Sequence, residues 1–245
     1  MDSTAPARLV GIGVGPGDPE LLTVRALRVL READVVFAPA VDPDVPGRAE
    51  SIAAAALPEL AMQRLPFAIG GDGAERLRAY EAAAERVVAA LDRAGPAGTV
   101  AFVTLGDPNV YSTFSGLARA VRAHRPGVVV DTVPGIMAFQ DLAARSGVVV
   151  LEGSERLLLV SLAEGPEALD GAFDDRRTAV VVYKGGRHLP EVAARLAGAG
   201  RDRGAVVGEL LGLPGERIEA LTGEVAPAAY LATVIVPPLG RRVTP

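Results

Sequence analysis

A carboxylate and a row of hydroxyls stand close together in one short stretch of the sequence. Asp107 follows the apolar run 99–104, and residues 111–113 read Tyr-Ser-Thr. The apolar run predicts a buried strand, and ligands of α/β sheets bind beyond the carboxyl ends of such strands. The Asp-Pro step at 107–108 is also a common way to cap and begin a helix, here over 109–124. Because backbone N–H groups at a helix start would lie beside the carboxylate and the hydroxyls, we expect a site for a small polar ligand.

Three further strand-to-helix junctions carry glycine and proline. The first is the Gly-rich stretch 11–19, which ends on a second Gly-Asp-Pro, and the others are 132–140 and 182–190. Glycine lets the backbone bend sharply and approach a ligand closely. A plain turn accounts for each junction alone, but four of them in one chain predict several ligand-binding loops at the edges of sheets.

The Gly-rich stretch departs from the known nucleotide-binding fingerprints. Gly11 and Gly13 match the first two glycines of Gly-x-Gly-x-x-Gly, but Pro16 occupies the third position. A proline there lacks an N–H group and cannot give the close helix packing that glycine allows. No Gly-Lys-Ser/Thr follows, so the stretch is not a P-loop. Nicotinamide or flavin binding is therefore disfavoured.

Lys184, Arg187 and His188 form a small cationic group beside two glycines. A single histidine more often caps a helix or packs in a core. Together with lysine and arginine it suits carboxylates, which arginine binds through paired hydrogen bonds. The sequence therefore predicts that a ligand of this loop carries carboxylate groups.

The chain has no cysteine and only two histidines, His124 and His188. This excludes disulfides, thiol catalysis, iron–sulfur clusters and cysteine-ligated zinc, and we expect no metal site. No nucleophile triad emerges, and no catalytic acid or base is predicted. What remains is catalysis by positioning, in which loops align two reactants.

The formal net charge is −5, and the sequence contains no basic tract. A general nucleic-acid binder needs a basic face, so we expect no nucleic-acid partner. The first residues lack the pattern of a signal peptide, and no run reaches the ~18 apolar residues of a membrane span. We therefore expect a cytoplasmic globular protein that has no membrane partner.

Strand-like and helix-like segments alternate along the chain, which predicts a mainly parallel sheet covered by helices. The alternation resumes after a boundary near residue 150. We therefore predict an α/β fold of two domains with mainly parallel or mixed sheets, over 1–150 and 151–245. The predicted strands are 8–15, 33–41, 61–69, 99–104, 127–135, 156–162, 178–186, 204–212 and 230–238, and the predicted helices are 19–34, 49–57, 74–93, 109–124, 136–147 and 189–200.

In order and spacing, these motifs resemble the tetrapyrrole (corrin/porphyrin) methylase family. The family's Gly-x-Gly-Pro-Gly-Asp-Pro-x-Leu-Leu-Thr motif is matched by residues 13–23, and its Ala-Asp-Val-Val strand by 33–36. Its Gly-Asp-Pro-x-x-Tyr loop is matched by 106–111, and its Val-Pro-Gly-Ile junction by 133–136. The resemblance covers nearly the whole chain, and its specificity comes from the combination of motifs.

Within the family, the segments "FVTLGDPNVYSTF", "LEGSE", "KGGRH" and "LLGLP" are most similar to the branch that methylates precorrin-2 at C20 in cobalamin synthesis. The siroheme branch usually has glycine where this chain has Leu105. The resemblance implies an S-adenosylmethionine-dependent methyltransferase, a tetrapyrrole substrate and a homodimer. It also implies that residues 1–150 carry the tetrapyrrole side and a cofactor loop, and that 151–245 complete the cofactor cleft.

The resemblance also implies particular site residues. Carried over position by position, the cofactor contacts would be Pro16, Leu105, Gly106, Asp107, Val110, Met137, Ala138, Lys184 and Gly212. The substrate is rich in carboxylates and faces the Gly-rich loop, so its expected contacts are Gly15, Arg25, Arg48, Tyr111, Ser112, Thr113, Arg187 and His188. Among these, the carboxylate of Asp107 suits the positive sulfonium and ammonium groups of the cofactor.

Several alternatives stay open. A methylase of the same fold could act at another corrin carbon, on uroporphyrinogen, or on the protein substrate of diphthamide synthesis. A non-catalytic nucleotide-binding α/β module and an NAD-dependent enzyme are alternatives of different classes. The sequence also leaves open whether the macrocycle is metal-free or contains cobalt.

Overall fold

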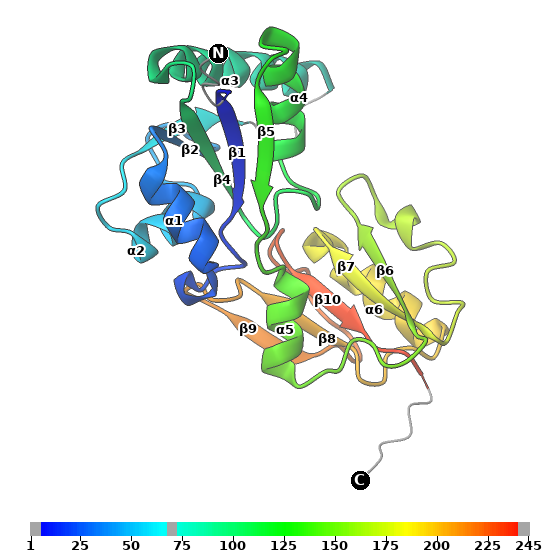
Figure 1. Cartoon of the computed structure of the whole chain (residues 1–245). Coiled ribbons are helices and arrows are strands. Elements are labelled where there is room, and N and C mark those ends of the chain that lie inside the picture. Colours follow the sequence, from blue (N-terminus) through cyan, green and yellow to red (C-terminus); the bar gives the residue numbers. More distant parts are fainter. Residues whose placement is uncertain (1–5, 68–72, 240–245) are drawn as a thin grey trace. The chain divides into compact units, whose positions relative to one another are not determined.

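The computed structural model describes residues 6–67 and 73–239. The chain divides into two compact units, Met1–Met137 and Ala138–Pro245. Each unit has its own five-stranded sheet, with helices packed on both faces (Figure 1). The predicted fold class, two α/β domains with parallel or mixed sheets, is confirmed.

The sheet of the first unit is parallel throughout. β1 pairs with both β4 and β5, so the loops that leave these three strands emerge next to one another at one edge. The predicted strand 61–69 is shorter in the structure, and its last two residues lie outside the described residues. The strands are β1 Arg8–Gly13, β2 Val35–Ala40, β3 Met62–Pro66, β4 Thr99–Thr104 and β5 Val129–Val133, in the order β3-β2-β4-β1-β5.

Helices cover both faces of this parallel sheet (Figure 1). Leu9 of β1 joins the core under one helix pair and Val10 joins the core under the other, because side chains alternate along a strand. A Cβ at Gly11 would overlap the ring of Phe114, so this glycine lets a helix lie directly on β1. The helices are α1 Val24–Glu32 and α2 Arg48–Ala56 on one face, and α3 Gly73–Ala94 and α4 Phe114–His124 on the other.

The second unit has a mixed sheet. β10 runs antiparallel to both β7 and β8, and its first residue, Thr233, lies opposite Tyr183 and Gly208. The carboxyl ends of β7 and β8 therefore meet at the same edge. The strands are β6 Arg156–Ser161, β7 Thr178–Tyr183, β8 Val206–Glu209, β9 Arg217–Ala220 and β10 Thr233–Val236, in the order β6-β7-β10-β8-β9. The helices are α5 Ala138–Ser146 on one face and α6 Leu189–Gly198 on the other, with the short 3-10 turns η2 Pro166–Leu169 and η3 Gly186–His188.

α5 belongs to the second unit, although the sequence places it in the first domain. Its buried residue Leu142 packs with Val181 and Ile235 of the second sheet. This apolar contact explains why the division falls after Met137 and not near residue 150. Gly147, with φ 72, ends α5 as predicted.

The helix predicted over 19–34 is interrupted. Asp18 and Pro19 begin only the 3-10 turn η1 Pro19–Leu21, and Leu22 is then extended. The hydroxyl of Thr23 caps α1 by accepting a hydrogen bond from the N–H of Ala26 at 3.1 Å. Asp18 and Thr23 can each cap a helix. Thr23 starts the longer one, because the helix α1 buries Ala26 and Leu30.

Within the described ranges, no helix combines the length and the apolar character that crossing a bilayer requires. The longest helix, α3, has 22 residues but carries acidic and basic side chains along its length. Its apolar residues form a stripe of alanine, valine and leucine that packs on the sheet. α3 is therefore a covering helix of the first unit.

Candidate functional site

Three loops meet backbone to backbone at the carboxyl edge of the first sheet. The N–H of Gly106, after β4, donates to the carbonyl of Gly15, after β1, at 2.8 Å. A Cβ on Gly13 or on Gly135 would overlap the carbonyl oxygen of Gly106. The glycines of the three motifs are thus explained by close contact between main chains, which leaves no room for side chains.

The other side of Gly106 is open. Its φ is 65, a left-handed conformation that glycine adopts readily, and no atom lies within 4 Å of the position that a Cβ would take. Leu105 before it is half-buried and packs against the core that α1 and α2 cover. The loop therefore presents a backbone face that carries no side chain at Gly106.

Asp107 braces two of these loops. Its Oδ1 accepts from the N–H of Asn109 at 2.8 Å, and its Oδ2 accepts from the N–H of Gly135 at 3.1 Å. The first bond is an Asx turn inside the β4 loop, and the second joins that loop to the β5 loop. Both carboxylate oxygens therefore hold the fold of the edge, whatever else they contact.

The hydroxyl segment does not lie in a helical turn, which corrects the sequence prediction. Tyr111 has φ 48, and α4 begins only at Phe114. The Ser112 hydroxyl lies 2.9 Å from the Thr104 hydroxyl and accepts from the N–H of Phe114 at 3.0 Å, whereas Thr113 caps nothing with its side chain. Ser112 is therefore committed to the local fold, and Tyr111 projects from a left-handed turn with 47% of its surface exposed.

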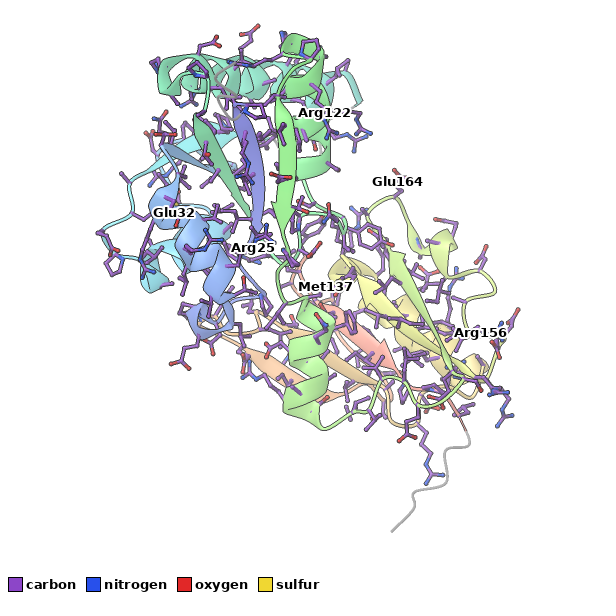
Figure 2. The ribbon with its side chains drawn as sticks, in the orientation of Figure 1. Arg25, Glu32, Arg122, Met137, Arg156 and Glu164 are labelled. Carbon is purple, nitrogen blue, oxygen red and sulfur yellow. The ribbon has the colours of Figure 1, made fainter. Side chains whose placement is uncertain are left out.

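The remaining predicted residues of the first unit lie at the same edge of its sheet. Gly15 and Pro16 are buried in the loop after β1, and Val110 is half-buried in the loop after β4. Arg25 is exposed in the first turn of α1 (Figure 2). Arg48 is exposed as the first residue of α2. The structure thus brings the predicted residues of this unit, including Met137 after β5, to the carboxyl ends of four neighbouring strands.

In the second unit, the predicted cofactor contacts also follow strand ends. Lys184, the single lysine of the sequence, comes directly after β7 with φ 57. It is half-buried, and this burial lowers the pKa of its ammonium group. Gly212 follows β8 at the same edge and donates its N–H to Oε2 of Glu216 at 2.6 Å. Ala138 is the first residue of α5, and the next residue, Phe139, donates its N–H to the hydroxyl of Tyr183 at 3.2 Å.

The charge of the cationic group also acts on a residue that the sequence did not indicate, Tyr230. The Nε of Arg187 donates to Nε2 of His188 at 2.9 Å. Burial raises the pKa of the Tyr230 phenol, and the charge of Arg187 opposes that rise. Tyr230 reads in the sequence as the first residue of a strand, but β10 begins only at Thr233. Nothing in the local pattern distinguishes it from a strand residue.

The loop that carries Tyr230 is fixed against the β7 loop. Ala228 donates its N–H to the carbonyl of Gly186 at 2.8 Å, and a Cβ on Gly186 would overlap the carbonyl of Ala229. The N–H of Ala229 in turn donates to the buried Glu209 at 2.8 Å. This packing explains one of the two glycines between Lys184 and Arg187.

The part of the chain that the structure describes contains no group of three or more His, Asp or Glu side chains that could hold a metal ion. The loops of the first unit offer backbone groups and a braced carboxylate, Asp107. Those of the second unit offer backbone groups and basic side chains. Within each unit, such groups are suited to binding a polar ligand.

The fold and the loops define the chain as a two-unit α/β protein whose Gly-rich loops follow the ends of its strands, where α/β proteins bind ligands. A sequence model of the tetrapyrrole (corrin/porphyrin) methylases matches residues 8–226, and the chain belongs to this family. The family resemblance seen in the motifs is confirmed.

Curated relatives span nearly the whole chain. The precorrin-2 C(20)-methyltransferase of a Sinorhizobium species is 31% identical over 97% of this chain and 98% of its own length. The cobalt-precorrin-2 C(20)-methyltransferase of Salmonella typhimurium is 32% identical over 94% of this chain and 95% of its own length.

Solved structures share the fold. A putative cobalamin synthesis related protein from Corynebacterium diphtheriae has a TM-score of 0.69 at 19% identity, covering 96% of this chain and 100% of its own. A uroporphyrin-III C-methyltransferase from Thermus thermophilus, complexed with S-adenyl homocysteine, has a TM-score of 0.61 at 27% identity, covering 94% and 97%.

Proposed function

We propose that this chain is the C20-methyltransferase of cobalamin biosynthesis, which transfers a methyl group from S-adenosylmethionine to precorrin-2 or to cobalt-precorrin-2. The observation that carries the proposal is the identity of 31% and 32% with two C20-methyltransferases over nearly the full length of each chain. One of these relatives is named for the metal-free macrocycle and the other for the cobalt form, so both substrates are candidates.

The loops of the first unit fit the proposed cofactor. Gly106 presents an open backbone face, and three main chains pack together behind it. A backbone face that carries no side chain lets a ligand approach the main chain closely, which supports a cofactor contact there. We assign cofactor contacts there to Pro16, Leu105, Gly106, Asp107, Val110 and Met137.

Asp107 contributes negative charge as well as shape. When bound, the cofactor would supply a methyl group on a positively charged sulfonium; its transfer in line to an electron-rich carbon would leave the sulfur as a neutral thioether. A carboxylate that already accepts two N–H bonds is fixed in place and reorganises little around that charge. Asp107 therefore favours a cationic ligand while it holds the β4 and β5 loops together.

In the second unit we assign cofactor contacts to Ala138, Lys184 and Gly212. A lysine beside a sulfonium would repel it, but burial lowers the pKa of Lys184 and so makes its neutral form easier to reach. The N–H of Gly212 is already donated to Glu216. The hydrogen-bonding group that Gly212 offers to a ligand is therefore its carbonyl oxygen.

The substrate contacts follow from charge. A reduced tetrapyrrole carries many carboxylates, and the guanidinium of Arg187, which donates through Nε to His188, offers them a cation. Arg25 and Arg48 are exposed cations at the strand edge of the first unit. We propose that these residues, with Gly15, Tyr111, Ser112 and Thr113, bind and orient the macrocycle.

We further propose that the enzyme is a homodimer, as the family resemblance implies, and that it is cytoplasmic. The edge strand β6 supports an interface between copies, because Leu158 on it is 38% exposed and Leu151 before it is 42% exposed. Light scattering combined with size-exclusion chromatography would give the mass of a dimer, and a monomer mass would overturn this part of the proposal.

A second candidate is methylation of a different tetrapyrrole. A uroporphyrinogen-III C-methyltransferase of Paracoccus denitrificans is 33% identical, but over 76% of this chain and 61% of its own length. The shorter match favours the C20 activity. Purified enzyme incubated with S-adenosylmethionine should add one methyl group to precorrin-2 or cobalt-precorrin-2, detected by product mass. Methylation of uroporphyrinogen alone would establish the second candidate instead.

A further inference from the structure

The loop 210–216, between β8 and β9, is wound into an unusual conformation. Leu210, Gly212 and Gly215 all have positive φ, at 49, 68 and 85. Two backbone hydrogen bonds hold its turns. The N–H of Leu213 donates to the carbonyl of Leu210 at 2.8 Å, and the N–H of Glu216 donates to the carbonyl of Leu213 at 3.1 Å. A non-glycine residue with left-handed φ is costly, so contacts around the loop must stabilise this conformation.

Glu216 supplies such contacts from within the loop. Its Oε2 accepts the N–H of Gly212 at 2.6 Å. The same carboxylate receives both terminal nitrogens of Arg145 in a two-point ion pair, and this pairing lowers the pKa of Glu216. A two-point arginine–carboxylate pair fixes direction as well as distance.

Arg145 ties this loop to α5. It lies in the last turn of α5, 3.6 Å from the buried carboxylate of Asp141. The helix is anchored at its start by the hydrogen bond between Phe139 and Tyr183. At its middle, Leu142 packs so closely on β8 that a Cβ at Gly208 would overlap its side chain. α5 therefore has a fixed position on the sheet from which Arg145 reaches the loop.

We propose that Arg145 and Glu216 are positioning residues that hold the Gly212 carbonyl in register with the start of α5. The inference rests on the proposed function, which assigns cofactor contacts to Gly212 and to Ala138. Ala138 begins the same helix that carries Arg145, so the ion pair connects two of these contacts through one rigid element. Neither Arg145 nor Glu216 needs to contact the ligand itself.

The test is calorimetric binding of S-adenosylhomocysteine to the full chain. Glu216→Ala removes both the acceptor for Gly212 and the ion pair, and should raise the dissociation constant about tenfold or more. Glu216→Gln keeps an acceptor oxygen, and Arg145→Lys keeps a charge but loses the two-point geometry, so each should raise it about three- to fivefold. The KM for S-adenosylmethionine should rise in parallel, with kcat within about twofold.

Arg195→Met is the matched control. Arg195 on α6 also pairs with two carboxylates, Glu191 and Asp170, and its side chain is similarly exposed at 32% against 37% for Arg145. Arg195→Met should lower the melting temperature about as much as Arg145→Lys does. Its dissociation constant for S-adenosylhomocysteine should stay within about twofold of the wild-type value.

The possible failures are distinguishable. A folded wild-type chain that binds no S-adenosylhomocysteine would refute the proposed function. Wild-type binding with unchanged affinity in Glu216→Ala would overturn the positioning role. If Glu216→Ala does not fold, Glu216→Gln and Arg145→Lys decide: unchanged affinity in both overturns the role, and weaker binding in both supports it.

Discussion

Asp107 accepts a hydrogen bond from the backbone N–H of Gly135 at 3.1 Å, across 28 positions of sequence. This bond joins the Gly-Asp-Pro loop after β4 to the Val-Pro-Gly loop after β5. The second Gly-Asp-Pro is different, because the Asp18 carboxylate accepts the N–H of Glu20, two residues on in the same turn, at 2.9 Å. The same tripeptide is therefore a local turn at 17–19 and a bridge between two loops at 106–108.

Replacing Asp107 should weaken both the fold and ligand binding. Asp107→Ala loses two bonds to a charged acceptor, which should lower the free energy of unfolding by about 1–3 kcal/mol. We expect the dissociation constant for S-adenosylhomocysteine to rise about tenfold or more in calorimetry. Asp107→Asn should be intermediate, since its amide nitrogen cannot accept from Gly135.

Asp42→Ala is the control for this experiment. Asp42 also forms an Asx turn, accepting the N–H of Asp44 at 2.8 Å, but it bridges no second loop. Its removal should leave affinity for S-adenosylhomocysteine unchanged. Equal effects of the two alanine substitutions would contradict the bridging role of Asp107.

A single methyl group at Gly135 should disrupt the edge of the first sheet. The added Cβ of Gly135→Ala would overlap the Gly106 carbonyl, and backbone atoms cannot move aside cheaply. We expect a loss of about 3 kcal/mol in urea unfolding, at the upper end for an overpacked site. Gly127→Ala is the matched control, because its Cβ would have no neighbour within 4 Å. A Gly135→Ala variant as stable as the control would refute the close contact.

Lys184 should titrate below the ordinary pKa of lysine, 10.5, because burial lowers its pKa. Since the unfolded chain then binds more protons between the folded pKa and 10.5, wild-type stability should rise with pH in that window relative to Lys184→Met. Reductive methylation with carbon-13 formaldehyde would label this single lysine, and NMR would follow its titration directly. A Lys184 signal that titrates at 10.5 or above would contradict the prediction.

The same label tests the assignment of Lys184 to the cofactor site. Addition of S-adenosylhomocysteine should shift the carbon-13 signal of Lys184, while the signal of the labelled N-terminal amine should stay unchanged. If the lysine signal does not move at saturating ligand, Lys184 is not a cofactor contact.

Arg201 should matter for stability and not for binding. Arg201 is 1% exposed, and its guanidinium donates to four backbone carbonyls of the second unit, those of Phe173, Asp175, Thr178 and Pro237. Arg201→Met leaves these carbonyls without that donor, and we expect a loss of about 3 kcal/mol on chemical unfolding. Arg203→Met, at an exposed position nearby, should cost little. Weakened cofactor affinity in a folded Arg201→Met variant would contradict a purely structural role.

The sequence predicted the sheets because their signals are local. Runs such as 99–104 are rich in apolar residues, and Gly147 takes the left-handed conformation that commonly ends a helix. β9 was not predicted, since it has only four residues and no buried one among them. Its place is set by pairing with β8, which is a tertiary contact.

The sequence predicted Gly- and Pro-rich loops after the strands, and the structure has them there, but the sequence missed what holds them. The left-handed turn at Tyr111 and the brace from Asp107 to Gly135 depend on contacts between separate loops. The same holds for Glu216, whose partner Arg145 lies tens of residues away. No spacing rule within one segment reports such pairs.

The central claim is the position of the methyl group on the macrocycle. The most direct measurement is carbon-13 NMR of the product formed from precorrin-2, or its cobalt form, and S-adenosylmethionine labelled in its methyl group. We predict one labelled methyl carbon attached at C20. A labelled methyl at any other ring carbon, or no labelled product from either substrate with folded enzyme, would contradict the account.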